Sequence, residues 1–176
     1  TAYAYWHGHS ERLIARLFKE AGRRAAVSTK VPPKNMEWPG HPRSRLALVF
    51  PPDWVRLSIE RSLRNLGQDS VEIYQFHVWH DSWLKDPLWP ELAAEMAKLK
   101  KEGKVRHWGV SINNDDPESA IELVKTGTVA VVQVLFNMFD SRAADKLLPL
   151  CRETGVGAIV RCPFDEGSLT GMLTPE

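Results

Sequence analysis

The sequence predicts an α/β fold in which parallel strands alternate with helices. Five short β-rich runs recur along the chain, separated by segments with helical patterning. The runs are apolar on both faces, as in a parallel sheet that is covered by helices. An open doubly wound sheet and a (β/α)8 barrel both satisfy this pattern. The open dinucleotide-binding sheet needs a glycine-rich turn after its first strand, and the chain contains no G-x-G-x-x-G segment.

The predicted strands are rich in β-branched and aromatic residues, which suit a pleated, buried surface. They cover residues 25–31, 71–78, 105–112, 129–137 and 156–162. Polar residues lie at or just before the carboxyl ends of these runs: Lys30, His77, Ser111, Gln133 and Asn137. A β/α barrel builds its site at the carboxyl ends of its strands, so this pattern favours a barrel enzyme. The alternative is that polar residues simply begin where strands end.

The predicted helices have start and stop signals at their ends. They cover residues 10–21, 54–66, 89–102, 117–125 and 141–154. Ser10 is expected to cap the first helix, and Gly22 to end it. Residues 32–53 hold six prolines and are predicted to form a loop over the site face, either as a substrate lid or as an insertion.

Composition and charge exclude several classes of protein. A net charge of +1 gives no global electrostatic case for binding nucleic acid or an anionic membrane surface. No apolar run approaches the length of a bilayer span. Two cysteines do not suggest a disulfide framework, which favours a reducing compartment, so we predict a cytoplasmic protein. The oligomeric state is not predicted. Because the chain starts at Thr1 and ends at Glu176 after a turn-like segment, residues 1–176 are expected to be one domain or a fragment of one.

Six segments, in the same order, resemble those of the aldo-keto reductases. They are TAYAYWHGHSE (1–11), VSTKV (27–31), VEIYQFH (71–77), HWGVS (107–111), VVQVLFN (131–137) and LLPLCRETGVGAIVRCPFDEGSLTG (147–171). The first three resemble the family's D-T-A-x-x-Y-G segment with Ser-Glu, its lysine strand and its D-L-Y-Q-x-H strand. The other three resemble its G-V-S strand, its Q-x-x-x-N strand, and its helix, strand and cofactor loop. The resemblance implies a barrel of eight β/α units, present here as an incomplete barrel of about strands 3 to 7.

The resemblance also implies a reaction. Family members reduce carbonyls or oxidise alcohols with a nicotinamide cofactor and no metal, so the expected partner is a small carbonyl or alcohol substrate. Tyr5 matches the general acid, Lys30 the cation that favours the phenolate and lowers the pKa of that phenol, and His77 the residue that orients the carbonyl. The family's catalytic aspartate would precede Thr1. Without the motifs, a surface aromatic is the favoured interpretation of Tyr5 and a hydrogen-bonded core histidine that of His77. Lys30 is then as readily a strand-end lysine that reaches solvent.

The resemblance assigns a further set of residues to the cofactor. Ser111 and Gln133 match the residues that hold the nicotinamide carboxamide, and Asn113 follows Ile112, where the family often has asparagine. Arg161 occupies the position of an aromatic residue that stacks under the nicotinamide ring. The matched cofactor loop supplies Pro163, Phe164, Gly167, Ser168, Leu169 and Thr170. The resemblance favours NADP(H) over NAD(H).

Three alternatives accompany this interpretation. Trp6 replaces a family glycine and either crowds the mouth of the site or alters the loop that carries Tyr5. A metal site is not predicted, because His77 and His80 would point to opposite faces of a strand and an H-x-H pair supplies only two ligands. The alternative function is a non-catalytic fragment or pseudo-enzyme that at most binds a nicotinamide nucleotide. The 176-residue chain by itself is expected to be inactive.

Overall fold

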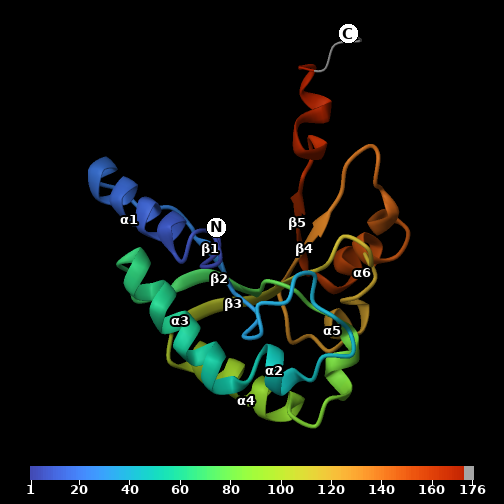
Figure 1. Ribbon diagram of the computed structural model, residues 1–176, viewed down its shortest axis with the longest axis horizontal. Coiled ribbons are helices and arrows are strands. Elements are labelled where there is room, and N and C mark those ends of the chain that lie inside the picture. Colours follow the sequence, from blue (N-terminus) through green and yellow to red (C-terminus); the bar gives the residue numbers. More distant parts are fainter. Residues whose placement is uncertain (173–176) are drawn as a thin grey trace.

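The computed structural model describes residues 1–172, and within them five strands form one parallel sheet (Figure 1). The strands are β1 (Ser28–Val31), β2 (Val71–Phe76), β3 (Val105–Ser111), β4 (Val131–Leu135) and β5 (Gly157–Arg161). Each strand pairs with the next one in the chain, so the sheet order is β1-β2-β3-β4-β5. The predicted parallel α/β organisation is confirmed. Every predicted strand is present in a shorter form.

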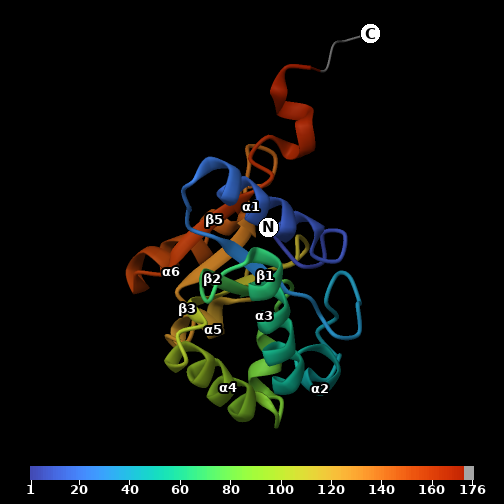
Figure 2. The same ribbon diagram turned by 90° about the vertical axis from the view of Figure 1, so that its left-hand side faces the viewer.

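The helices cover one side of this sheet (Figures 1 and 2). They are α1 (His9–Ala21), α2 (Leu46–Val49), α3 (Pro52–Leu66), α4 (Trp89–Lys101), α5 (Ile121–Lys125) and α6 (Leu147–Thr154). α3 contacts β1, α4 contacts β3, α6 contacts β5, and α1 packs on α3. Crossovers between parallel strands are almost always right-handed, so a sheet whose strands follow chain order places its connecting helices on the same side. The opposite side of the sheet is left to build a site.

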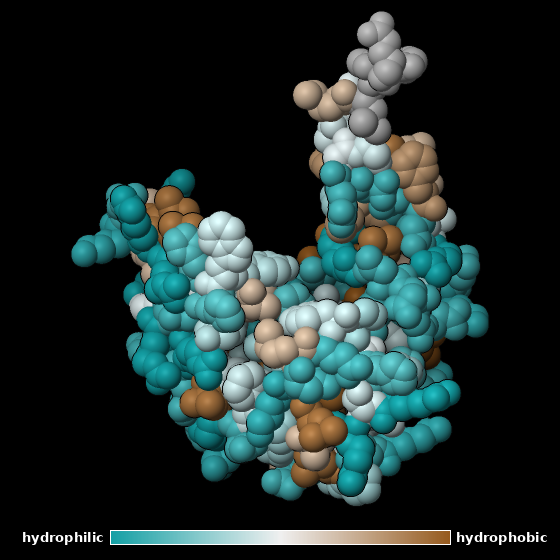
Figure 3. Space-filling model, in the orientation of Figure 1, coloured by the Kyte–Doolittle hydropathy of each residue, from teal (hydrophilic) through white to brown (hydrophobic). Residues whose placement is uncertain are grey.

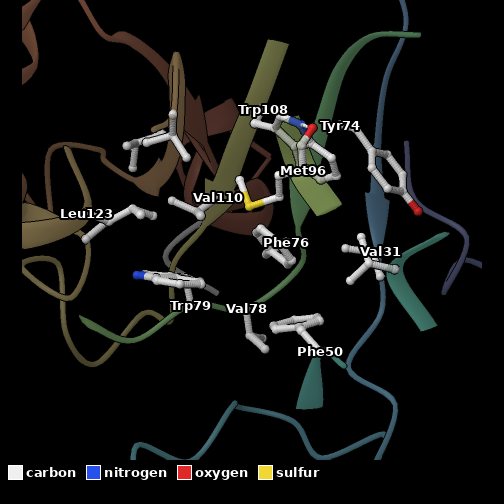
Figure 4. Close-up of a cluster of buried hydrophobic side chains, with 14 of the residues drawn as sticks. Val31, Phe50, Tyr74, Phe76, Val78, Trp79, Met96, Trp108, Val110 and Leu123 are labelled. Carbon is white, nitrogen blue, oxygen red and sulfur yellow. Dashed lines mark hydrogen bonds between the residues drawn. The ribbon is translucent and has the colours of Figure 1, made fainter. Parts of the chain in front are cut away.

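The core lies between the sheet and the helices and is rich in aromatic residues (Figure 4). Phe76 of β2 and Trp108 of β3 point to the helix side, and their rings stack with centroids 5.6 Å apart. α4 contributes Met96, whose carbonyl accepts a hydrogen bond from Nε1 of Trp108 at 2.9 Å. Phe50, beside α2, packs on Phe76 at 4.7 Å. The centre of the sheet is therefore fixed by large side chains in defined orientations.

Two helix starts differ from the prediction. Ser10 does not cap α1; Gly8 occupies the N-cap position with a φ of 80°, and Oγ of Ser10 instead accepts a hydrogen bond from Oγ1 of Thr1 at 2.6 Å. α3 begins at Pro52, two residues before the predicted start, because proline has no N–H to lose in the first turn.

Two further helices are shorter than predicted. In the segment 117–125 only α5 is α-helical, and its first N–H groups are capped by Asp81, which accepts from the backbone N–H of Glu122 at 2.6 Å. In the segment 141–154, a 3₁₀ helix at Arg142–Ala144 precedes α6. Pro149 explains the interruption, because its ring clashes with the carbonyl four residues earlier and it cannot donate a helical hydrogen bond.

The segment 32–53 is more structured than a loop. Its second part forms α2, and Leu46, Val49 and Phe50 are fully or almost fully buried in the core. Its first part runs over the carboxyl ends of β1 and β2 and contributes to the site described below. The predicted position over the site face is thus confirmed for the first part, whereas the second part belongs to the core.

Candidate active site

The carboxyl ends of the five strands carry the polar residues of the candidate site. Lys30 lies in β1, His77 directly follows β2, and Ser111 and Arg161 end β3 and β5. Strand register brings these groups level, since Ser111 pairs with Gln133 in β4. A pocket of about 510 Å³ opens here. Of the predicted site residues, the pocket is lined by Tyr5, His77, Ser111, Asn113, Gln133 and Arg161.

Tyr5 reaches this pocket from a tight loop before α1. Its side chain is 48% exposed, and its ring meets the His77 ring edge to face with centroids 5.7 Å apart. Trp6 and His7 both have a φ of 50°, which is unusual outside glycine. Trp6 is 81% exposed and does not line the pocket, so Trp6 does not crowd the site.

Lys30 is buried behind Tyr5. It is 4% exposed, and its Nζ lies 5.9 Å from the centroid of the Tyr5 ring. The Nζ group donates a hydrogen bond to the carbonyl of Thr1 at 2.8 Å. Burial, with a smaller contribution from the positive charge of Arg161, lowers the pKa of Lys30 from 10.5 to about 8. At neutral pH the lysine is therefore a buried cation beside a phenol.

His77 is held in its neutral form. Burial is the main cause that lowers its pKa from 6.5 to about 3, and the charges of Lys30 and Arg161 act in the same direction. Its Nδ1 is buried without a hydrogen-bond partner in the described part of the chain, which leaves Nε2 to reach the pocket. The Trp38 ring packs against the imidazole at 4.6 Å. A neutral imidazole can donate one hydrogen bond to a carbonyl oxygen without carrying charge.

The amide and hydroxyl groups of the pocket suit a carboxamide ligand. Nε2 of Gln75 donates to Oε1 of Gln133 at 3.2 Å, which leaves the amide nitrogen of Gln133 as a donor. Gly109 makes room for Gln75, because a Cβ there would lie 3.1 Å from Cγ of Gln75. Asn113 differs, since its Nδ2 already donates to the carbonyl of Gly40 at 2.9 Å. Ser111 and Gln133 thus offer the donor and acceptor groups that a nicotinamide carboxamide needs.

Arg161 adds a positive charge to the wall of the pocket. Its Nη2 donates a long hydrogen bond, 3.4 Å, to the carbonyl of Ile112, and its Nε is buried without a partner among residues 1–172. The guanidinium lowers the pKa of both Lys30 and His77. Arg161 therefore adds a smaller effect to the burial that lowers the pKa of Lys30 and His77.

The predicted cofactor loop does not reach this pocket. After β5 the chain forms a 3₁₀ helix, Asp165–Thr170, that extends away from the body of the molecule (Figures 1 and 2). Oγ of Ser168 donates to Asp165 at 2.6 Å and Oγ1 of Thr170 to the carbonyl of Gly167 at 2.6 Å, so these hydroxyls are engaged locally. The loop residues that lie outside the pocket lining are Pro163, Phe164, Gly167, Ser168, Leu169 and Thr170. Figure 3 shows the surface hollowed between the α1 side and this projecting segment.

Sequence reasoning missed one wall of the pocket. Trp38, Pro39, Asn114 and Asp115 line it together with the predicted residues. The proline-rich segment 32–53 is held in place by three hydrogen bonds to its backbone carbonyls. The Asn113 side chain donates to Gly40, that of Ser82 donates to Pro42 at 2.7 Å, and that of Trp83 donates to Ser44 at 2.8 Å. The run of prolines indicated a loop over the site, but no signal in the chain showed which of its side chains would enter.

The described residues contain no group of three or more histidine, cysteine, aspartate or glutamate side chains arranged to hold a metal ion. None of the helices described is both long and apolar enough to cross a membrane.

Comparisons with known proteins agree on one family. The model of the aldo/keto reductase family matches residues 1–176. The NADH-specific methylglyoxal reductase of Escherichia coli (strain K12) is 30% identical over 182 residues, covering 99% of this chain and 54% of the relative. The glycerol dehydrogenase AKR11B4 from Gluconobacter oxydans has a similar structure, with a TM-score of 0.78 and 28% identity over 100% of this chain and 52% of that one.

A third relative was solved with ligands. The aldo/keto reductase from Klebsiella pneumoniae in complex with NADP and acetate gives a TM-score of 0.69 at 25% identity, covering 97% of this chain and 54% of that one. The chain spans about half the length of the curated relatives it matches. The structural likenesses confirm the predicted fold class, because the five parallel strands correspond to part of a (β/α)8 barrel.

Proposed function

Because this chain belongs to the aldo/keto reductase family, we propose that it forms part of a barrel domain that reduces small aldehydes or ketones to alcohols. The proposed reaction transfers a hydride to the carbonyl carbon and a proton to the carbonyl oxygen. One observation supports the proposal: Tyr5 and the neutral His77 line one pocket with their rings in contact, and the buried ammonium of Lys30 lies 5.9 Å from the centroid of the Tyr5 ring.

Each of the three residues has a distinct role in the proposed mechanism. A reduced nicotinamide cofactor supplies the hydride when it is bound. Nε2 of His77 donates a hydrogen bond to the carbonyl oxygen and orients it. Tyr5 gives its phenolic proton to the same oxygen as negative charge develops there. The Lys30 ammonium stabilises the phenolate that remains, and its burial strengthens this interaction relative to water.

Ser111 and Gln133 support the cofactor assignment. Both line the pocket, and the hydrogen bond from Gln75 orients the Gln133 amide so that its nitrogen is free to donate. We propose NADP(H) as the preferred cofactor, in line with the NADP complex of the Klebsiella pneumoniae relative. The Escherichia coli relative is described as NADH-specific, so the two cofactors should be compared directly.

The test uses a protein extended at both ends to the full length of the relatives. Oxidation of NADPH and of NADH is followed by absorbance with an aromatic aldehyde as substrate. We expect Tyr5→Phe to lower kcat by about 10²- to 10⁴-fold, as for loss of a general acid. Tyr3→Phe is the matched control, because Tyr3 lies in the same loop but stacks on Arg61 at 4.7 Å and does not line the pocket.

The outcomes separate the enzyme from a non-catalytic relative. A silent full-length protein, or a Tyr5→Phe variant that turns over as fast as the wild type, contradicts the catalytic assignment. Binding of NADPH without turnover then supports the alternative of a pseudo-enzyme. Turnover by residues 1–176 alone contradicts the expectation that this chain is an inactive part of the barrel.

A further inference from the structure

Glu11 is a buried acid that the proposed reaction does not use. It lies in the first turn of α1, on the helix side of the sheet, and is fully buried. Its Oε1 accepts a hydrogen bond from Oγ1 of Thr29 at 2.6 Å, and its Oε2 accepts one from Nδ2 of Asn65 at 2.8 Å. In the described part of the chain it forms no ion pair. A buried acid is costly unless it is well hydrogen-bonded, so these two bonds determine where Glu11 lies.

The first bond reaches the strand that carries the proposed catalytic lysine. Thr29 is fully buried and directly precedes Lys30 in β1. Successive side chains in a strand point to opposite faces, so Thr29 faces the helices while Lys30 faces the pocket. The bond to Glu11 therefore ties α1 to β1 immediately behind Lys30.

The second bond reaches the loop that carries Tyr5. Asn65 lies at the end of α3 and donates to Glu11. This position of Asn65 requires glycine at residue 8, because a Cβ on Gly8 would lie 2.2 Å from Nδ2 of Asn65. Gly8 closes the Tyr5 loop by donating its N–H to the carbonyl of Tyr3 at 2.7 Å. Asn65 thus packs against the base of the loop while it is bonded to Glu11.

We propose that Glu11, Thr29 and Asn65 form a positioning network that sets the distance between Tyr5 and Lys30. The inference rests on the proposed function, because it assigns the network a purpose in proton transfer. Tyr5 lies in the loop before α1, and Lys30 lies in β1. The network joins this loop to this strand through a single layer of side chains. A displacement of about 1 Å at a reacting group can cost on the order of 10²-fold in rate. Glu11 acts through Tyr5 and Lys30 and does not touch the substrate pocket.

The experiment removes one hydroxyl from the network in the full-length protein. Thr29→Val keeps the shape of the side chain and abolishes its bond to Glu11. We expect kcat for aldehyde reduction to fall by about 10- to 100-fold, while KM for the aldehyde and the Kd for NADPH change by less than about threefold. Thr29→Ser, which restores the hydroxyl, should recover most of the lost kcat. Glu11→Gln keeps one acceptor and should give an intermediate loss.

Ser58→Ala is the matched control. Ser58 is also buried on the helix side, and its hydroxyl has no hydrogen-bond partner among the described residues, so its loss should leave kcat unchanged. A Thr29→Val variant with the kcat of Ser58→Ala overturns the positioning role, as does a Thr29→Ser variant that recovers thermal stability without recovering kcat. If Thr29→Val does not fold, the same criterion is applied to Glu11→Gln. A wild type without turnover overturns the proposed function itself, and the positioning role with it.

Discussion

The two ends of the sheet differ in how their site residues are held. Around β1, three of the four strand residues are buried, and Lys30 donates a hydrogen bond to the carbonyl of Thr1 and lies beside the Tyr5 ring. In β5 no residue is buried, Val160 is 40% exposed, and the chain that follows projects from the body with Phe164 61% exposed. The contacts that place the proposed catalytic groups thus lie within this chain. The described residues do not bring the predicted cofactor loop to the pocket.

The largest expected effect comes from removing the buried cation at the well-packed end. Lys30→Met keeps the apolar stem and loses the ammonium, so kcat for reduction should fall by about 10³-fold. Thermal unfolding should occur at the same or a higher temperature, because burial of the ammonium is itself unfavourable. Lys34→Met, at an exposed lysine of the proline-rich segment, is the control and should change neither quantity. A Lys30→Met variant that keeps more than about a tenth of the wild-type kcat would contradict the role of the cation.

The pH dependence of reduction should follow the titration of Lys30. With a pKa of about 8, the lysine is charged below this pH and loses its charge above it, so kcat/KM should fall as the pH rises through about 8. His77, with a pKa of about 3, stays neutral at every pH above that value and should add no acidic limb in the range near neutrality. A rate that keeps rising well above pH 8 would show that the ammonium is not needed.

Arg161, at the end of β5, acts by its charge on Lys30 in β1. Removing this charge should have a smaller effect on the rate than removing the Lys30 ammonium. Arg161→Met should raise the pKa of both Lys30 and His77, since the guanidinium lowers both. NMR titration of the His77 ring measures one shift, and displacement of the alkaline limb of the rate profile to higher pH measures the other. Arg152→Met, an exposed change on α6, serves as the control. Unchanged titration of His77 in Arg161→Met would mean that the charge does not reach the imidazole.

Two glycine substitutions compare the packing of the middle of the sheet with that of its β5 end. A Cβ on Gly109 of β3 would lie 2.8 Å from the carbonyl of Val131, whereas one on Gly157 of β5 has its closest contact at 3.6 Å. Gly109→Ala should therefore lower the free energy of unfolding by about 1 to 3 kcal/mol, and Gly157→Ala should change it by less than about 0.5 kcal/mol. Denaturant titration of the full-length variants measures both values. Equal losses would mean that the two strands are packed alike.

The sequence predicted the strands and most helices because each depends on local signals. Apolar runs and glycine stops locate β2 and α3 without knowledge of their neighbours. The start of α5 was wrong because its cap, Asp81, comes from a distant segment. The interruption before α6 had a local cause in Pro149, and the proline rule could have found it.

The candidate site was predictable where it depends on strand ends and unpredictable where it depends on packing. Strand alternation places Lys30, Ser111 and Gln133 on one face, and the structure brings the latter two into the pocket with Lys30 behind Tyr5. Trp38 could not be predicted, because its position follows from hydrogen bonds that other segments make to the proline-rich segment. The roles of these residues remain predictions that the variants above would test.

The hydrogen bonds that fix Gly40, Pro42 and Ser44 have a consequence for ligand binding. Because these bonds already order the wall, the wall does not lose conformational freedom when a ligand binds. The free energy of association therefore does not include the entropic cost of ordering this loop. Recognition at this wall is then a fit to a preformed shape beside Trp38 and His77. If the proposed reduction is correct, selectivity among carbonyl compounds should follow their size and shape at this wall.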